Sequence, residues 1–132
     1  MISDLVPASE VTPNAEIMKE RTKHFALLVI RTCRRLPVFE ERRIITGQLL
    51  RSATSVAANY RAACRARSKA EFISKLGIVL EEADESLFWL ELLVDAGITG
   101  GDRLKHPLQE ASELVSIFVA SLRTAEGLHS AI

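Results

Sequence analysis

Apolar residues recur at steps of three and four along most of the chain, which is the spacing that places side chains on one face of an α-helix. No stretch alternates apolar and polar residues for long enough to predict a strand. The four apolar stripes are, in chain order, Met18, Phe25, Leu28, Val29 and Leu36; Ile45, Leu49, Ala53, Val56, Tyr60 and Ala63; Phe72, Leu76, Val79, Ala83, Leu87, Leu90 and Val94; and Ala111, Val115, Phe118, Leu122 and Ala125. We therefore predict an all-α fold, an up-down-up-down four-helix bundle with short connections.

The first two helices are bounded by capping and breaking residues. Asn14 is suited to cap the first helix, and Pro37 ends it. The preceding residues are polar, include two prolines and show no period, so residues 1–13 are predicted to be a flexible N-terminal arm. The second helix should extend from about Glu40 to Arg67. On these bounds a single four-helix-bundle domain occupies residues 14–129.

The last two helices carry clearer signals. Ser68, with Glu71 three residues later, forms a capping box that opens the third helix. Gly97 ends that helix in the manner of a C′ glycine. Pro107 is then expected in the first turn of the fourth helix, whose apolar stripe runs out near Gly127.

Length and hydropathy limit the class of protein. A chain of 132 residues allows one compact domain. The longest apolar run, residues 25–30, is far shorter than the ~20 residues that a membrane-spanning helix needs. No basic segment precedes an apolar run at the start, so a signal peptide is not expected and the expected location is cytoplasmic. Cys33 and Cys64 should lie at opposite ends of the bundle, too far apart for a disulfide.

Charge is balanced overall and segregated along the chain. Ten basic and two acidic residues lie between Arg31 and Lys69, whereas seven acidic residues and one basic residue lie between Glu71 and Asp95. Four arginines of the second helix are expected to lie within ~80° of one another, roughly opposite its apolar stripe. They are Arg43, Arg51, Arg61 and Arg65.

Two interpretations of these arginines are open. Guanidinium groups bind phosphates in pairs of hydrogen bonds, so the four are candidate nucleic-acid-binding residues. Alternatively they form a solvated helix face that pairs with acids of a neighbouring helix, for which Glu81 and Glu85 are available. Neither aromatic interleaving nor a named motif supports nucleic-acid binding independently.

The third helix has more apolar residues than one core requires. Four of them fall outside its inward stripe and are candidate oligomer-interface residues: Ile78, Phe88, Trp89 and Leu92. Singly exposed apolar residues are normal, but four on one helix favour a second buried surface. Symmetric self-assembly is the commonest way to bury such a surface, so a homo-oligomer is predicted.

No catalytic or metal site is expected. A di-iron bundle needs two Glu-x-x-His motifs, and the chain has one, Glu126 to His129. Glu20 and His24 have metal-pair spacing, but a half-exposed His beside a solvated Glu explains them better. Nucleophile and phosphate-loop motifs are absent from the sequence. We therefore predict a protein that is not an enzyme, with no cofactor, no metal and no small-molecule substrate.

The central residues resemble the bacterial four helix bundle protein family, also called the 23S rRNA intervening-sequence protein or S23 family. The likeness extends over about residues 25–98. The family signature is Ser-Ile-x-x-Asn-Ile-Ala-Glu-Gly, and Ser55 and Asn59 keep two of its positions. Ala62 and Ala63 replace the final Glu and Gly, so no role of that Glu carries over.

This resemblance implies a cytosolic bundle that assembles as a ring, with a homopentamer expected. It also implies similarity to the accessory proteins of diversity-generating retroelements, which assist a reverse transcriptase and bind nucleic acid. Our leading hypothesis is a non-enzymatic oligomeric bundle that binds nucleic acid, RNA rather than DNA, through its arginine face. The alternative is a protein–protein interaction scaffold with no nucleic-acid role.

Overall fold

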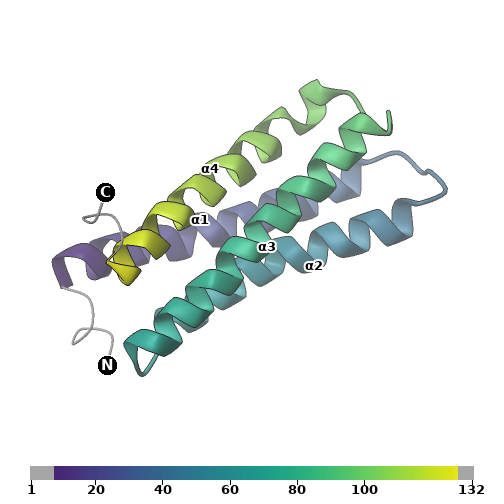
Figure 1. The fold of residues 1–132 in the computed structure, drawn as a ribbon. Coiled ribbons are helices and arrows are strands. Elements are labelled where there is room, and N and C mark those ends of the chain that lie inside the picture. Colours follow the sequence, from purple (N-terminus) through teal and green to yellow (C-terminus); the bar gives the residue numbers. More distant parts are fainter. Residues whose placement is uncertain (1–7, 128–132) are drawn as a thin grey trace.

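A computed structural model describes residues 8–127 of the chain, and this part contains four α-helices and no strand. They are α1 (Ala8–Arg35), α2 (Arg42–Ala63), α3 (Lys69–Asp95) and α4 (Gly101–Glu126). Consecutive helices run in opposite directions and lie side by side (Figure 1). The prediction of an all-α bundle is therefore confirmed. None of the helices in the described part is long and apolar enough to cross a membrane.

The N-terminal end of α1 differs from the prediction. The helix begins at Ala8 and continues through Pro13, so a start at Asn14 and an arm covering residues 8–13 were wrong. A proline inside a helix removes one backbone hydrogen bond, and for that reason the prolines of residues 1–13 favoured an arm over a helix. Residues 1–7 of the predicted arm, and residues 128 and 129 of the predicted domain, lie outside the described part.

Helix α2 ends at Ala63, four residues before the predicted end at Arg67. Backbone bonds of three-residue span close the turn: Arg65 N donates to Ala62 O, and Ala66 N to Ala63 O, each at 3.0 Å. This turn leads directly to the cap of α3. Arg65 therefore lies in the α2–α3 turn rather than on α2.

Both ends of α3 match the predicted signals. Ser68 Oγ accepts a hydrogen bond from the backbone N–H of Glu71 at 3.1 Å. At the other end Gly97 has φ of +73°, and the N–H of Ile98 donates to Leu93 O at 3.1 Å. Together with the bond from the Gly97 N–H to Val94 O at 3.0 Å, this bond forms a Schellman motif, the helix end that a C′ glycine favours.

Helix α4 begins earlier than predicted. Gly100 is its N-cap, and Pro107 is buried at the seventh helical position rather than in the first turn. The apolar face begins at Leu104, which is fully buried, so packing extends the helix on the N-terminal side of the proline. The far end is as predicted, because Gly127 adopts φ of +74° after Glu126.

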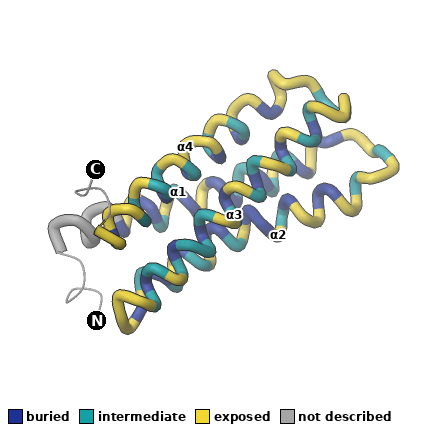
Figure 2. Tube along the Cα trace, in the orientation of Figure 1, coloured by how far each residue is buried: buried dark blue, intermediate teal, exposed yellow. Residues whose placement is uncertain are grey.

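The core runs along the inward faces of all four helices (Figure 2). Every residue of the predicted α2 stripe is buried, whereas Leu28, Leu87, Val94, Val115 and Leu122 of the other stripes are only half-buried. The core also includes Leu93, Leu104 and Leu114, which the sequence analysis did not assign.

Helices α2 and α3 approach each other through a pair of serines. Ser52 and Ser86 are both fully buried, and Ser86 Oγ donates to Ser52 Oγ at 2.9 Å. Packing between α1 and α4 is the sparsest of the adjacent helix pairs. The bundle is thus close-packed on its α2–α3 side and more open on its α1–α4 side.

Candidate nucleic-acid interface

The four predicted arginines are all exposed, as the helical wheel indicated. Arg43 lies in the first turn of α2, Arg51 in its middle and Arg61 in its last turn, with Arg65 in the turn that follows. At 1.5 Å per residue, Arg43 and Arg61 are about 27 Å apart along the helix axis. The four therefore extend along the whole length of α2.

Arg51 differs from the other three because it is paired within its own chain. Arg51 Nη1 lies 2.9 Å from Glu82 Oε2, and Arg51 Nη2 is paired with Glu85. These bonds, with that to Glu85 the strongest, raise the pKa of Arg51. The pKa of Glu85 is lowered, chiefly because Trp89 Nε1 donates to its carboxylate at 3.1 Å and also because of Arg51. Arg51 is therefore a poor candidate for a phosphate contact.

This pairing confirms the solvated ion-pair interpretation for one arginine and corrects the acids involved. Glu85 was expected as a partner, but Glu82 takes the place predicted for Glu81. Glu82 lies three residues before Glu85 and shares the side of α3 that faces α2. Glu81 is turned about 100° away on the helix and is exposed.

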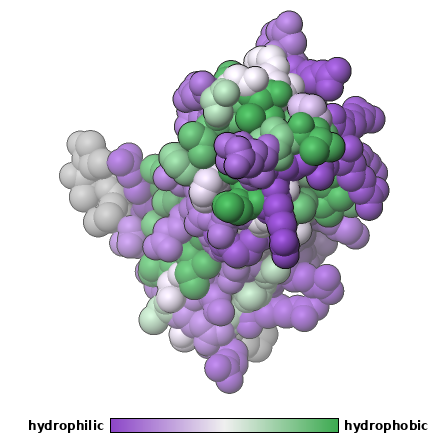
Figure 3. All heavy atoms as spheres, turned by 90° about the vertical axis from the view of Figure 1, so that its right-hand side faces the viewer, coloured by the Kyte–Doolittle hydropathy of each residue, from purple (hydrophilic) through white to green (hydrophobic). Residues whose placement is uncertain are grey.

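Six other arginines of α1, α2 and the α2–α3 turn are exposed and have no carboxylate partner within residues 8–127. They form two groups at opposite ends of α2. The α1–α2 end comprises Arg31, Arg34, Arg35 and Arg43; the α2–α3 end comprises Arg61 and Arg65. Figure 3 views the molecule from the α1–α2 end, where hydrophilic side chains project around a hydrophobic patch.

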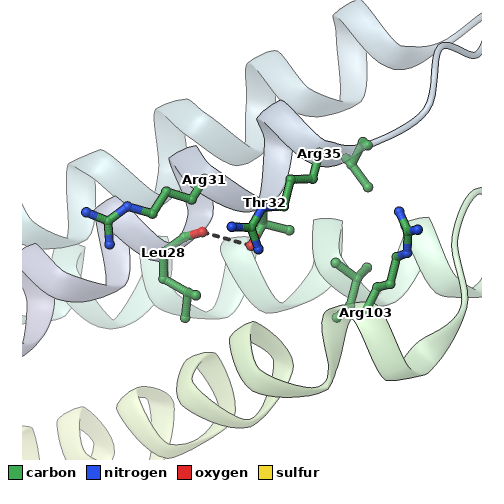
Figure 4. A pocket seen from close by; sticks show the side chains of 7 residues that line it. Leu28, Arg31, Thr32, Arg35 and Arg103 are labelled. Carbon is green, nitrogen blue, oxygen red and sulfur yellow. Dashed lines mark hydrogen bonds between the residues drawn. The ribbon is translucent and has the colours of Figure 1, made fainter.

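A hollow between α1 and α4 lies beside the α1–α2 end. This α1–α4 hollow has a volume of about 560 Å³ and is lined by Leu28, Arg31, Thr32, Arg35, Leu36, Arg103 and Leu104. In Figure 4 the guanidinium groups of Arg31 and Arg103 lie at its two ends, with that of Arg35 between them. Sequence reasoning missed this arrangement, because Arg103 is some seventy residues from the other arginines and only the fold brings it close.

The candidate interface residues of α3 are not equally available. Phe88 is 52% exposed, while Ile78, Trp89 and Leu92 are half-buried. Trp89 and Leu92 pack against the core of their own chain. The Phe88 and Trp89 rings meet edge to face with centroids 5.0 Å apart. The structure also exposes three large apolar residues that sequence reasoning did not single out: Ile17, Val38 and Ile44.

Neither cysteine is part of a reactive arrangement. Both are free, and Cys33 and Cys64 lie near the C-terminal ends of antiparallel helices, so the predicted absence of a disulfide between them is confirmed. Burial raises the pKa of Cys33 to about 11 and also raises that of Cys64. Both thiols therefore stay protonated near neutral pH, where the thiolate is the reactive form.

No group of three or more His, Cys, Asp or Glu side chains in the described part is placed to hold a metal ion. His24 Nε2 lies 3.9 Å from Glu20 Oε2, and both side chains are exposed, as in a solvated pair. His129 of the single Glu-x-x-His motif lies outside the described residues.

Comparison with known proteins agrees with this fold. Residues 15–120 match the family described as 23S rRNA-intervening sequence protein. The chain belongs to this family. A solved structure, a protein of unknown function from the S23 ribosomal protein family of Bacteroides thetaiotaomicron, is 29% identical with a TM-score of 0.73, covering 83% of this chain and 97% of that one. None of the curated proteins compared with the chain matches it.

The signature positions of the 23S rRNA-intervening sequence family lie on α2. Asn59 Nδ2 donates to Ser55 Oγ at 2.8 Å and to the Ser55 carbonyl oxygen at 3.0 Å. Both side chains are half-buried, and their bonds are local to one helical turn. Ala63, which stands where the signature has Gly, is fully buried in the core. The two retained signature residues are thus bonded to each other within α2.

Proposed function

We propose that this protein is a non-enzymatic, self-assembling bundle that binds nucleic acid, RNA rather than DNA, through exposed arginines. The observation that carries the proposal is the set of six exposed arginines of α1, α2 and the α2–α3 turn that have no carboxylate partner among residues 8–127. An arginine stays charged at any physiological pH and presents donors that match a phosphate. Unpaired arginines are therefore available to replace the counterions of a polyanion.

Three of the four originally predicted residues remain in the proposal. Arg43, Arg61 and Arg65 are unpaired in the described part, whereas Arg51 is neutralised by α3. Contacts from such side chains to phosphates fix position on a strand but carry little base information. We expect weak sequence discrimination. The family description refers to an RNA, which favours RNA as the first polymer to test.

Self-assembly is the second part of the proposal. Phe88 leaves about half of its surface in solvent in the C-terminal half of α3, next to the half-buried Trp89. Packing of a second copy against this aromatic pair would remove that surface from water, and closed symmetric assemblies are the common result. A ring, expected to be pentameric, is the arrangement proposed here. The two free thiols fit the reducing cytoplasm, where we expect the protein to act.

The test of nucleic-acid binding is an RNA titration at several salt concentrations. Binding of single-stranded RNA should weaken as salt rises, with a log–log slope of about −0.7 for each phosphate neutralised. Replacing Arg43, Arg61 and Arg65 by Ala should weaken binding of unrelated sequences alike and flatten the slope. The control variant removes three cations elsewhere, with Lys23, Lys105 and Arg123 changed to Ala.

Equal losses of RNA affinity in the two triple variants would show that overall charge, not these three arginines, governs binding. Absence of RNA binding by the wild-type protein at low salt would refute the proposal.

The scaffold alternative is favoured by one observation, the pairing of Arg51 with Glu82 and Glu85. In that alternative the remaining arginines meet exposed acids of α3 across subunit interfaces, such as Glu81, Asp84 or Glu91. The same triple variant would then break up the oligomer, because a buried charge without its partner costs about 3–5 kcal/mol. Sedimentation of that variant separates the two: retained assembly with weakened RNA binding supports the nucleic-acid proposal.

A further inference from the structure

The α1–α4 hollow combines two properties that the α2 arginines lack. Its walls include the aliphatic side chains of Leu28, Leu36 and Leu104, and its rim carries three guanidinium groups. A volume of about 560 Å³ falls within the range of about 300–1,000 Å³ typical of small-molecule sites. The hollow can therefore hold an apolar or aromatic group whose attached anion stays at the rim.

The charges at the rim are uncompensated. None of Arg31, Arg35 and Arg103 pairs with a carboxylate in the described part of the chain. The three lie in a row along the hollow rather than around one point (Figure 4). A row of guanidinium groups matches successive phosphates of a strand better than it matches one small anion.

One polar group of the hollow is partly free. Thr32 Oγ1 donates its proton to the carbonyl oxygen of Leu28 at 2.8 Å, within α1. Its oxygen keeps lone pairs that can accept from an exocyclic amino group or a ring N–H of a base. Guanidinium planes at the rim can stack on a base face, as in proteins that bind single strands.

We propose that the α1–α4 hollow takes one unstacked base of a single-stranded RNA, while Arg31, Arg35 and Arg103 contact the neighbouring phosphates. The inference rests on the proposed function and adds to it the preference for single over double strands. A base in a duplex is paired and stacked and cannot enter such a site without unstacking. The α2 arginines, in contrast, can contact phosphates of either form.

The test fills the hollow without changing its charge. Thr32→Phe places a ring in the space and loses only a local hydrogen bond within α1. The matched control is Thr54→Phe, because Thr54 makes the same bond to Leu50 O at 2.7 Å and is exposed on α2, away from the hollow. Circular dichroism checks that both variants fold. Binding is compared for a uridine oligonucleotide and an abasic oligonucleotide with the same number of phosphates.

The wild-type protein should bind the base-bearing strand at least about fivefold more tightly than the abasic strand, since one stacked base adds measurable affinity. Thr32→Phe should reduce this ratio of affinities to about one and leave binding of the abasic strand unchanged. Thr54→Phe should keep the wild-type ratio. Arg35→Ala should weaken binding of both strands more than Arg34→Ala does, because Arg34→Ala removes an equal charge outside the hollow.

Equal binding of the two strands by the wild-type protein, or a ratio unaffected by Thr32→Phe, would overturn this inference while leaving the proposed function intact. Absence of binding to either strand at low salt would overturn both. A third outcome is saturable binding of uridine 5′-monophosphate that Thr32→Phe blocks, with no binding of either strand. That outcome would identify a free nucleotide as the ligand and refute the proposal that the hollow binds an RNA strand.

Discussion

Arg51 and Arg61 lie ten residues apart on the same helix and are both exposed, yet their surroundings differ. Arg51 faces α3 and meets two carboxylates, whereas Arg61 has no such partner among the described residues. A helical wheel places both on the outward face, because it describes one helix at a time. Which arginines are neutralised depends on the neighbouring helix. Sequence reasoning identified Glu85 as a possible partner but could not separate Glu81 from Glu82.

Replacing Arg51 by Ala should destabilise the bundle by up to about 1 kcal/mol, the upper end of the range for exposed ion pairs. The side chain of Arg51 is 48% exposed, so solvent screens the interaction. Because the folded-state pKa of Glu85 is lowered, its contribution is complete above the ordinary value of 4.5 and is lost as the pH falls through the folded-state value. Urea denaturation should thus show a difference from wild type at pH 7 that shrinks on acidification below about pH 4.5.

Arg61→Ala is the control for this comparison and should change stability by no more than about 0.5 kcal/mol at either pH. Equal destabilisation by the two substitutions would contradict the assignment of the ion pairs.

At the scale of the helix, the sequence predicted the four elements and most of their inward faces. Every residue of the predicted α2 stripe is buried, although the buried face of α2 also includes Thr46 and Ser52. The two boundary errors on the N-terminal side, at α1 and α4, share a cause: Pro13 and Pro107 were treated as boundaries, and both lie inside helices. Tertiary packing around residues such as Leu104 outweighs the single hydrogen bond that a proline removes.

Replacing either of two glycines of the α3 region by Ala should change the stability of the bundle, in opposite directions. Gly97 has φ of +73°, a conformation that costs an L-residue about 1–2 kcal/mol. Gly77 lies within α3, and an added Cβ would meet no atom within 4 Å. Gly97→Ala should therefore lower the melting temperature, whereas Gly77→Ala should raise stability by about 0.5–1 kcal/mol. Shifts of the same sign in thermal unfolding would contradict the Schellman end of α3.

At the scale of the whole molecule, surface features depend on relations between helices that sequence spacing does not contain. The α1–α4 hollow joins Arg103 to Arg31 and Arg35 through the antiparallel arrangement of α1 and α4. In the same way, four apolar residues of α3 were predicted to lie outside the core, but Trp89 and Leu92 pack against the core of their own chain. The fold was therefore more predictable than the sites on its surface.

The assembly prediction now depends mainly on Phe88. Sedimentation at micromolar concentration should show a species several times the 14.6 kDa of one chain. Phe88→Ser should shift the distribution toward smaller species, because the exposed ring is the anchor proposed for the second copy. Val38→Ser removes another exposed apolar side chain, which is 93% exposed outside the helices, and should have no effect. A wild-type monomer at that concentration would rule out the assembly.

The neutral middle of α2 has a consequence for how strand length would govern binding. With Arg51 occupied by α3, the free cations of α2 and its flanks lie in two groups about 27 Å apart. A short oligonucleotide would reach only one group and gain only that group's contacts. A longer strand bound to one group of arginines would hold its remaining phosphates near the other group at high effective concentration. Its affinity would therefore rise by avidity rather than by new kinds of contact. In a ring of several copies the same spacing would repeat, and polymer length, more than sequence, would select what the protein retains.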